Sequence, residues 1–196
     1  MAYDLVVIGA SWGGLVALER VLGGLPEDFG AAVAIAQHRS PDGHSEGLAP
    51  LLGTHSRLPV VDADDKQPIE PGTVYLAPPD YHLYIQEDGF ALSMDEAVLY
   101  SRPSIDVLFE SASEVYRERA VGVVLTGANE DGATGLLRIR RRGGYAIVQN
   151  PVEAERSEMP RAAISIAEPD QVLALDAIAP ALARLCGSRV TAGDER

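Results

Sequence analysis

The sequence is poor in several residue types, and each shortage excludes a class of protein. It has one cysteine, Cys186, so it forms no internal disulfide and suits a reducing compartment. Its 16 lysine and arginine residues are outnumbered by 29 acidic residues, giving a net charge of −13. That balance argues against nucleic acid or an anionic membrane as the main partner. No apolar run is long enough to cross a bilayer and no basic leader opens the chain, so we expect a cytoplasmic protein without membrane insertion.

The sequence also lacks the patterns that are typical of metal and thiol sites. It has no H-E-x-x-H motif and no cysteine pair, and nothing around Cys186 supplies a helper base for a thiol nucleophile. Three of the four histidines, His44, His55 and His82, stand in loop, helix-end and hairpin contexts, and we expect them on the solvated surface. The expectation is therefore a protein that uses no metal and no organic cofactor.

Short apolar stretches alternate with helical patterns along the chain, which predicts an α/β fold. Strands are expected at residues 5–8, 32–37, 58–61, 73–77, 120–125, 145–149 and 172–175. An Asp88-Gly89 pair between two further short apolar stretches indicates one antiparallel hairpin. The prediction is a doubly wound, mostly parallel sheet with this one hairpin excursion. A single three-layer domain is expected over residues 1–190, followed by a frayed tail at 191–196.

The stretch VVIGASWGG, residues 6–14, is the most informative part of the chain. A buried strand ends in glycine and a helix resumes at Leu15, which places Ser11 in the turn between them. Residues 9–13 read as the G-x-S-x-G turn that presents a serine nucleophile. The same glycines resemble a dinucleotide-binding G-x-G-x-x-G pattern, although Ser11 replaces its middle glycine. Serine is also a common helix cap, so the turn alone leaves all three interpretations open.

Two further reactive residues follow other predicted strands. His38 comes directly after the strand at 32–37, and Asp131 lies in the loop after the strand at 120–125. Because ligands of open α/β sheets bind outside the carboxyl ends of the strands, we expect Ser11, His38 and Asp131 at one edge of the sheet. Serine, imidazole and carboxylate together are the parts of an acyl-transfer site. Taken singly, Asp131 is also explained as a helix cap and His38 as a half-buried histidine at a strand end.

Seven segments, in order along nearly the whole chain, resemble one known family: Val7–Ser11, Gln37-His38, Pro71–Pro78, Arg102–Phe109, Val124–Gly127, Asp131–Ala133 and Met159-Pro160. They look like the catalytic domain of the chemotaxis protein-glutamate methylesterases of the CheB type. The resemblance implies a cytoplasmic Ser-His-Asp hydrolase that needs no cofactor. Such enzymes remove methyl groups from glutamate methyl esters on chemoreceptor helices, and many also deamidate receptor glutamines. The family's catalytic residues fall on Ser11, His38 and Asp131.

The chain departs from the family pattern around the nucleophile. Trp12 stands where the family usually has threonine, and Thr126-Gly127-Ala128-Asn129 replaces Thr-Gly-Met-Gly. We expect the Trp12 N–H and a donor from the 126–129 turn to hold the oxyanion, with Trp12, Gly127, Ala128 and Asn129 shaping the substrate pocket. The first strand begins near residue 4, so no N-terminal receiver domain is expected. Three alternatives stay open: a nucleotide-binding oxidoreductase, a silent module that binds a receptor or sensor kinase, and a related hydrolase with another ester or amide substrate.

Overall fold

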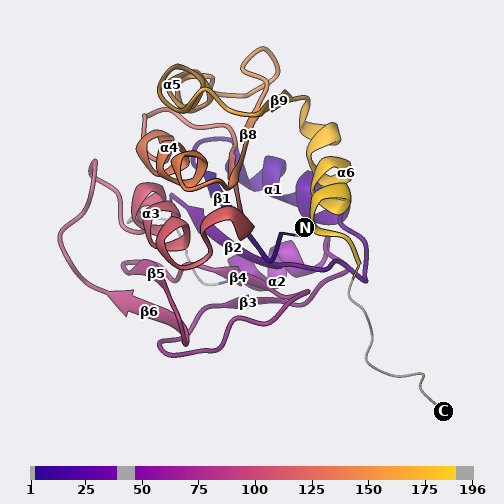
Figure 1. Cartoon of the computed structure of the whole chain (residues 1–196), viewed down its shortest axis with the longest axis vertical. Coiled ribbons are helices and arrows are strands. Elements are labelled where there is room, and N and C mark those ends of the chain that lie inside the picture. Colours follow the sequence, from indigo (N-terminus) through magenta and orange to yellow (C-terminus); the bar gives the residue numbers. More distant parts are fainter. Residues whose placement is uncertain (1–2, 39–46, 189–196) are drawn as a thin grey trace.

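Seven parallel strands form the central sheet of the computed structural model, which describes residues 3–38 and 47–188 (Figure 1). They are β1 (Leu5–Ala10), β2 (Ala32–Gln37), β3 (Val60–Asp62), β4 (Val74–Leu76), β7 (Ala120–Val124), β8 (Tyr145–Gln149) and β9 (Gln171–Leu173). The strands pair in the order β3-β4-β2-β1-β7-β8-β9, and every pair is parallel. The order reverses between β1 and β7, which is where ligands of such sheets bind.

Helices cover both faces of this sheet (Figure 1). One face carries α1 (Gly14–Gly23), α2 (Leu48–Gly53) and α6 (Leu175–Cys186), and the other carries α3 (Ile105–Val115), α4 (Ala133–Arg141) and α5 (Glu158–Ala167). An antiparallel hairpin of β5 (His82–Gln86) and β6 (Gly89–Ser93) packs beside α3, and the short 3-10 helix η1 (Arg117–Arg119) precedes β7. The prediction of a doubly wound, mostly parallel sheet with one hairpin is confirmed.

The alternation of side chains along β1 explains the two hydrophobic layers. Val6 and Ile8 belong to the cluster under α1 and α6, whereas Leu5 and Val7 belong to the cluster under α3, α4 and α5. All four are fully buried, because successive strand residues point to opposite faces and both faces are covered. The apolar run that predicted this strand therefore reflects burial from two sides.

Most predicted elements lie within a few residues of their observed bounds. The strands β2 and β8 have the bounds predicted, whereas β1 continues two residues beyond the predicted end, to Ala10. The helix α5 begins before Pro160, which fits there because the first turn of a helix leaves its N–H groups unpaired. A short helix is also predicted from Ser45 to Leu52, and α2 covers most of that range. Its predicted start at Ser45, the domain end at 190 and the tail at 191–196 lie outside the described residues.

The prediction for His82 is wrong. His82 is 1% exposed, its Nδ1 accepts from the N–H of Ser104, and its Nε2 donates to the carbonyl of Glu96. A buried imidazole with both ring nitrogens paired costs little, so this histidine joins the hairpin to the start of α3. His55 is half-exposed at 49% of its side chain, near Glu19, and His44 lies outside the described residues.

The Cys186 thiol and the lengths of the helices bear on a thiol nucleophile and on membrane insertion. Cys186 is buried at the end of α6, and burial raises the pKa of its thiol to about 12, so the thiol stays protonated and unreactive at neutral pH. Across residues 3–38 and 47–188, no helix is long and apolar enough to span a bilayer.

Candidate active site

Ser11 is the first residue after β1, in the turn that leads into α1. Its N–H donates to the carbonyl of Thr126 at 3.0 Å, and its carbonyl accepts from the N–H of Gly14 at 2.8 Å. Gly13 has a φ of 77°, which glycine adopts without steric penalty. Gly13 is also the cap residue of α1, and no side chain caps this helix. The hydroxyl of Ser11 therefore does not cap α1.

His38 directly follows β2 and lies beside Ser11 at the same edge of the sheet. Its N–H donates to the carbonyl of Ala10 at 3.0 Å, which continues the pairing of β2 with β1. Its Nε2 lies 2.7 Å from Oδ2 of Asp131, which is 93 residues away in the sequence. The side chain of His38 is 9% exposed and that of Asp131 is fully buried, so solvent screens their interaction little.

The carboxylate of Asp131 is held by the beginning of α3. It accepts from the Ser104 hydroxyl at 3.0 Å, the Ile105 N–H at 2.7 Å and the Asp106 N–H at 2.9 Å. Burial alone raises the pKa of Asp131, but the hydrogen bonds from His38 and these N–H groups outweigh burial and hold it below its usual value. Asp131 is therefore ionised and acts only as an acceptor, so the N–H of His38 lies on Nε2.

Asp131 caps a helix, although not the one that follows it in the chain. It caps α3, while Asp106 on α3 caps α4 in return: Oδ1 of Asp106 accepts from the N–H groups of Gly132 at 3.0 Å and Gly135 at 2.7 Å. Burial, with the nearby charge of Asp131, raises the pKa of Asp106 to about 6. This reciprocal capping fixes the carboxylate of Asp131 relative to both helices and hence to His38.

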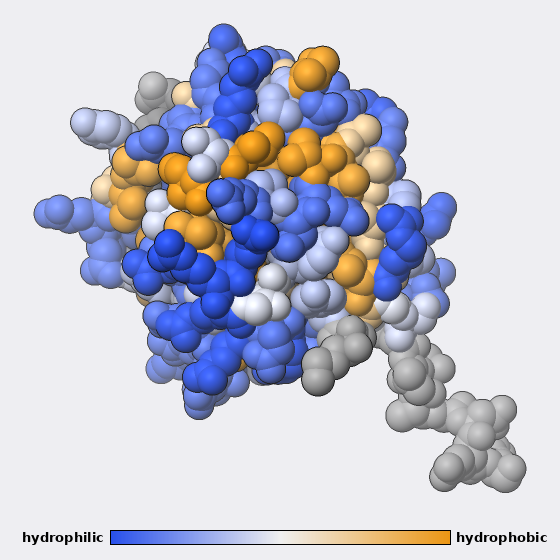
Figure 2. Space-filling model, turned by 45° about the horizontal axis from the view of Figure 1, so that its top comes forward, coloured by the Kyte–Doolittle hydropathy of each residue, from blue (hydrophilic) through white to orange (hydrophobic). Residues whose placement is uncertain are grey.

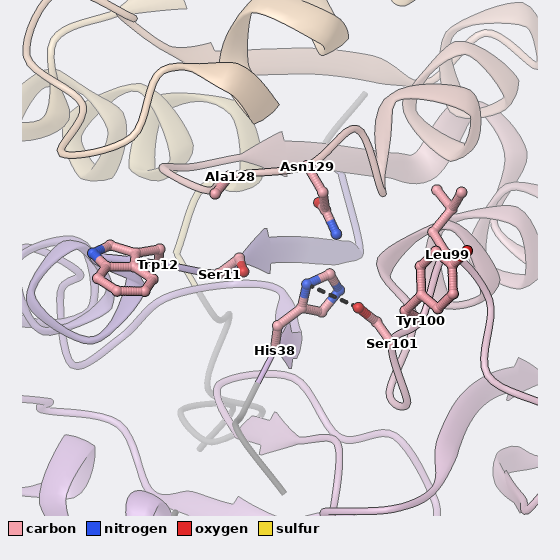
Figure 3. A pocket seen from close by; sticks show the side chains of 8 residues that line it. All are labelled: Ser11, Trp12, His38, Leu99, Tyr100, Ser101, Ala128 and Asn129. Atoms are coloured by element: carbon pink, nitrogen blue, oxygen red, sulfur yellow. Dashed lines mark hydrogen bonds between the residues drawn. The ribbon is translucent and has the colours of Figure 1, made fainter.

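Ser11 and His38 line one cavity of about 370 Å³ (Figure 3). The other lining residues are Trp12, Leu99, Tyr100, Ser101, Ala128 and Asn129. Figure 3 shows Trp12 on one side of Ser11 and the pair Leu99 and Tyr100 on the other. The structure thus brings together Ser11, His38, Trp12, Ala128 and Asn129 in one cavity, with Asp131 buried behind His38.

Gly127 differs from the expectation for the pocket. It is buried outside the cavity lining, and its N–H already donates to the carbonyl of Arg156 at 3.1 Å, so this N–H is not available to an oxyanion. A Cβ at Gly127 would lie 2.1 Å from Cε of Met159 and 3.0 Å from Cβ of Ser11. Glycine is needed here because the turn passes tightly between these two side chains.

Two other backbone groups are free to act as oxyanion donors. Among residues 3–38 and 47–188, the N–H groups of Trp12 and Ala128 have no hydrogen-bond partner. Trp12 follows the candidate nucleophile at the beginning of α1, and Ala128 lies in the facing loop after β7. Unpaired N–H groups at a helix start favour a negative oxygen.

The indole of Trp12 is fixed by the loop before α5. Its Nε1–H donates to Oε1 of Glu155 at 2.9 Å, and the guanidinium of Arg156 lies over the ring at 5.2 Å from its centre. The Thr126 hydroxyl donates to the Trp12 carbonyl at 2.9 Å. The side chain nevertheless stays 59% exposed beside Ser11. It forms a rigid, accessible wall at the mouth of the cavity.

The residues Leu99, Tyr100 and Ser101 were not predicted as part of the site. They belong to a tight turn in which Val98 and Ser101 exchange hydrogen bonds of 3.1 and 2.8 Å. Leu99 and Tyr100 have φ values of 48° and 63°, which glycine or asparagine usually adopts in such turns. Since neither residue type is present, the sequence carried no signal for this turn.

Within the described residues, no group of three or more histidine, cysteine or acidic side chains is arranged to hold a metal.

Known proteins similar to this chain share one described activity. The CheB methylesterase family model matches residues 6–182. A Leptospira interrogans protein provisionally named protein-glutamate methylesterase/protein-glutamine glutaminase is 46% identical over 94% of this chain and 96% of that protein. Protein-glutamate methylesterase FrzG of Myxococcus xanthus is 42% identical over 92% of this chain, which spans 54% of FrzG. The crystal structure of the Thermotoga maritima CheB methylesterase catalytic domain, 32% identical, matches 94% of this chain and all of that one with a TM-score of 0.88.

Proposed function

The chain belongs to the CheB methylesterase family, whose relatives are named protein-glutamate methylesterases, and we propose that it demethylates glutamate methyl esters on a chemoreceptor or chemoreceptor-like protein. The proposed catalytic residues are Ser11, His38 and Asp131. The observation that carries the proposal is the 2.7 Å contact between the buried Asp131 and His38, which lines the same cavity as Ser11.

The first half of the reaction forms an acyl-enzyme. Nδ1 of His38 takes the proton of the Ser11 hydroxyl while the serine oxygen attacks the ester carbonyl carbon. The ionised Asp131 holds the ring through Nε2 and stabilises the imidazolium. The N–H groups of Trp12 and Ala128 receive the oxyanion, and one such donor is worth about 2.7–4 kcal/mol in the transition state. Methanol leaves with the proton from His38.

The second half of the reaction releases the glutamate carboxylate. Water enters the cavity, His38 takes one of its protons, and the resulting hydroxide attacks the acyl carbon. The intermediate collapses, His38 returns its proton to the Ser11 oxygen, and the glutamic acid side chain departs and releases its remaining proton to water as a carboxylate. In both halves of the reaction, Asp131 stabilises the imidazolium of His38, and the N–H groups of Trp12 and Ala128 stabilise the oxyanion.

Deamidation of glutamine is a second proposed activity, because the Leptospira relative's name includes protein-glutamine glutaminase. The same attack by Ser11 on a carboxamide carbon expels ammonia in place of methanol, with His38 supplying the proton. An amide is a poorer acyl donor than an ester, so we expect deamidation to be the slower of the two. The proposed substrates are segments exposed on the cytoplasmic side of a receptor, which assigns the enzyme to the cytoplasm.

Methanol release from methyl-labelled receptor tests this proposal. The purified protein should release labelled methanol, and the variant Ser11→Ala should lose nearly all of it. Ser56→Ala serves as a control, because the Ser56 hydroxyl accepts from the N–H of Leu58 and Ser56 does not line the cavity. Release by Ser11→Ala at the rate of the unmodified protein would reject the mechanism. The absence of release from every receptor tried would favour the silent binding module.

A further inference from the structure

The two ring nitrogens of His38 have different partners. Nε2 donates to Asp131, so Nδ1 of the neutral ring carries the lone pair that serves as general base. The structure gives this lone pair to Ser101: the Ser101 hydroxyl lies 3.3 Å from Nδ1 (Figure 3). Because an unprotonated nitrogen can only accept, Ser101 is the donor in this contact.

Ser11 needs the same lone pair. Among residues 3–38 and 47–188, its hydroxyl has no hydrogen-bond partner, although it lines the cavity together with His38 and Ser101. Nδ1 has one lone pair, so it accepts the hydroxyl of Ser11 or that of Ser101, and only the first arrangement leads to attack on an ester. In this structure the base nitrogen of His38 is therefore bonded to Ser101 and not to Ser11.

The position of Ser101 depends on a strained turn. Ser101 closes the tight turn that begins at Val98, and the two residues between them, Leu99 and Tyr100, hold left-handed backbone conformations that side chains disfavour. Tyr100 is fully exposed and Leu99 is 41% exposed, and both line the cavity. A protein segment that fills the cavity over Ser11 contacts these two side chains, and such contact acts on the turn that carries Ser101.

We propose that Ser101 is a positioning residue that holds the base nitrogen of His38 in the resting enzyme and yields it to Ser11 when a protein substrate displaces the Leu99–Tyr100 turn. This inference rests on the proposed function, since it takes His38 as the base and Ser11 as the nucleophile. The contact of 3.3 Å is long for a hydrogen bond, so it holds the ring in place and is exchanged at little cost.

The size of the effect follows from the strength of one weak hydrogen bond. The net contribution of such a bond leaves Nδ1 free in only a fraction of resting molecules, and the reactivity of Ser11 is reduced to that fraction of its full value. Removing the Ser101 hydroxyl should then raise the reactivity of Ser11 about two- to fivefold toward a reagent too small to move the turn. A receptor substrate, which displaces the turn itself, should gain less.

The rate of labelling by diisopropyl fluorophosphate measures the reactivity of Ser11 toward a small reagent. The Ser11 oxygen forms a bond to phosphorus, fluoride leaves, and the proton passes to His38. Ser101→Ala should be labelled faster than the unmodified protein, whereas Ser101→Thr, which keeps a hydroxyl, should be labelled at the original rate. Ser93→Ala is the matched control, because the Ser93 hydroxyl accepts from Asp95 at the beginning of the same loop and does not contact His38.

Two further measurements separate a positioning role from a structural one. In ¹⁵N NMR spectra of the imidazole, Ser101→Ala should shift the Nδ1 resonance of His38 and leave the Nε2 resonance in place. In methanol release from receptor, Ser101→Ala should change the rate less than it changes labelling. Unchanged or slower labelling, an unmoved Nδ1 resonance, or equal acceleration on both substrates would overturn the inference. Labelling that persists in Ser11→Ala would instead reject the proposed function itself.

Discussion

At the residue scale, the most heavily bonded group of the site is the Asp131 carboxylate. It accepts from the His38 ring, the Ser104 hydroxyl and the N–H groups of Ile105 and Asp106. Replacing the carboxylate by an amide keeps the shape but turns an NH₂ toward one or more of these donors. The His38 ring then loses its acceptor at Nε2, and the wrong tautomer becomes favourable.

We therefore predict that Asp131→Asn lowers kcat for methanol release by about 10⁴-fold. The variant should still bind receptor, because Asp131 is buried behind His38 and does not line the cavity. Steady-state methanol release, together with a receptor pull-down, checks both parts. Asp62→Asn, at an exposed acid of β3, should leave the rate unchanged. A loss of less than tenfold in Asp131→Asn would remove Asp131 from the proposed triad.

Trp12 is the second residue whose environment leads to a prediction. Since Glu155 and Arg156 hold the indole at the cavity mouth, we expect Trp12→Thr to lower kcat/KM on receptor about tenfold, the size of a lost aromatic contact surface. Hydrolysis of a small activated ester should change less than twofold, because the Trp12 N–H remains. Glu155→Gln keeps an acceptor for the indole and should behave like the unmodified protein. Equal losses on receptor and small ester would reject a role for Trp12 in substrate selection.

At the scale of elements, α3 and α4 begin side by side and cap one another. Asp131, before α4, accepts from N–H groups of α3, and Asp106, in α3, accepts from Gly132 and Gly135 at the start of α4. Carboxylates at helix N-termini are favourable, but two of them close together in a buried place repel. Asp106 is the carboxylate that is destabilised by burial and by this repulsion: its pKa rises to about 6, whereas the pKa of Asp131 stays low.

The ionised carboxylate of Asp106 should make the free energy of unfolding depend on pH. Because the folded pKa of Asp106 is above its unfolded value, the folded state holds this proton more tightly, and stability falls as pH rises from about 4 through about 6. Asp106→Asn keeps an acceptor without the charge. In urea unfolding it should be more stable than the unmodified protein by about 1–2 kcal/mol at pH 8, a value reduced for partial exposure. The difference should vanish near pH 4; lower stability of Asp106→Asn at pH 8 would contradict the argument.

The elements also show what a sequence can predict. The strands were found because apolar runs such as Ala32–Gln37 reflect burial on both faces, and the ends of three of them drew attention to Ser11, His38 and Asp131. The role of Asp106 depends on hydrogen bonds between residues 26 and 29 positions apart, for which no local pattern exists. The turn at Val98 was missed because it lacks glycine, and His82 was misplaced because its burial depends on α3.

At the scale of the whole molecule, the sheet topology assembles the site. Since β1 is central, with β2 on one side and β7 on the other, residues that follow these three strands meet at the point where strand order reverses. The surface in Figure 2 is mostly hydrophilic, crossed by a band of hydrophobic side chains. Together with the net charge of −13, this fits a protein partner better than a nucleic acid.

In the proposed mechanism, Ser11 and His38 act as one unit on glutamate methyl esters. Rates of methanol release from methyl-labelled receptor by Ser11→Ala, His38→Ala and the double variant test it most directly. If the two residues work in a single step, each single variant loses nearly all activity and the double variant is little worse than either. A double variant whose loss equals the product of two separate losses, or full turnover by Ser11→Ala, would show that the two residues do not share one catalytic step.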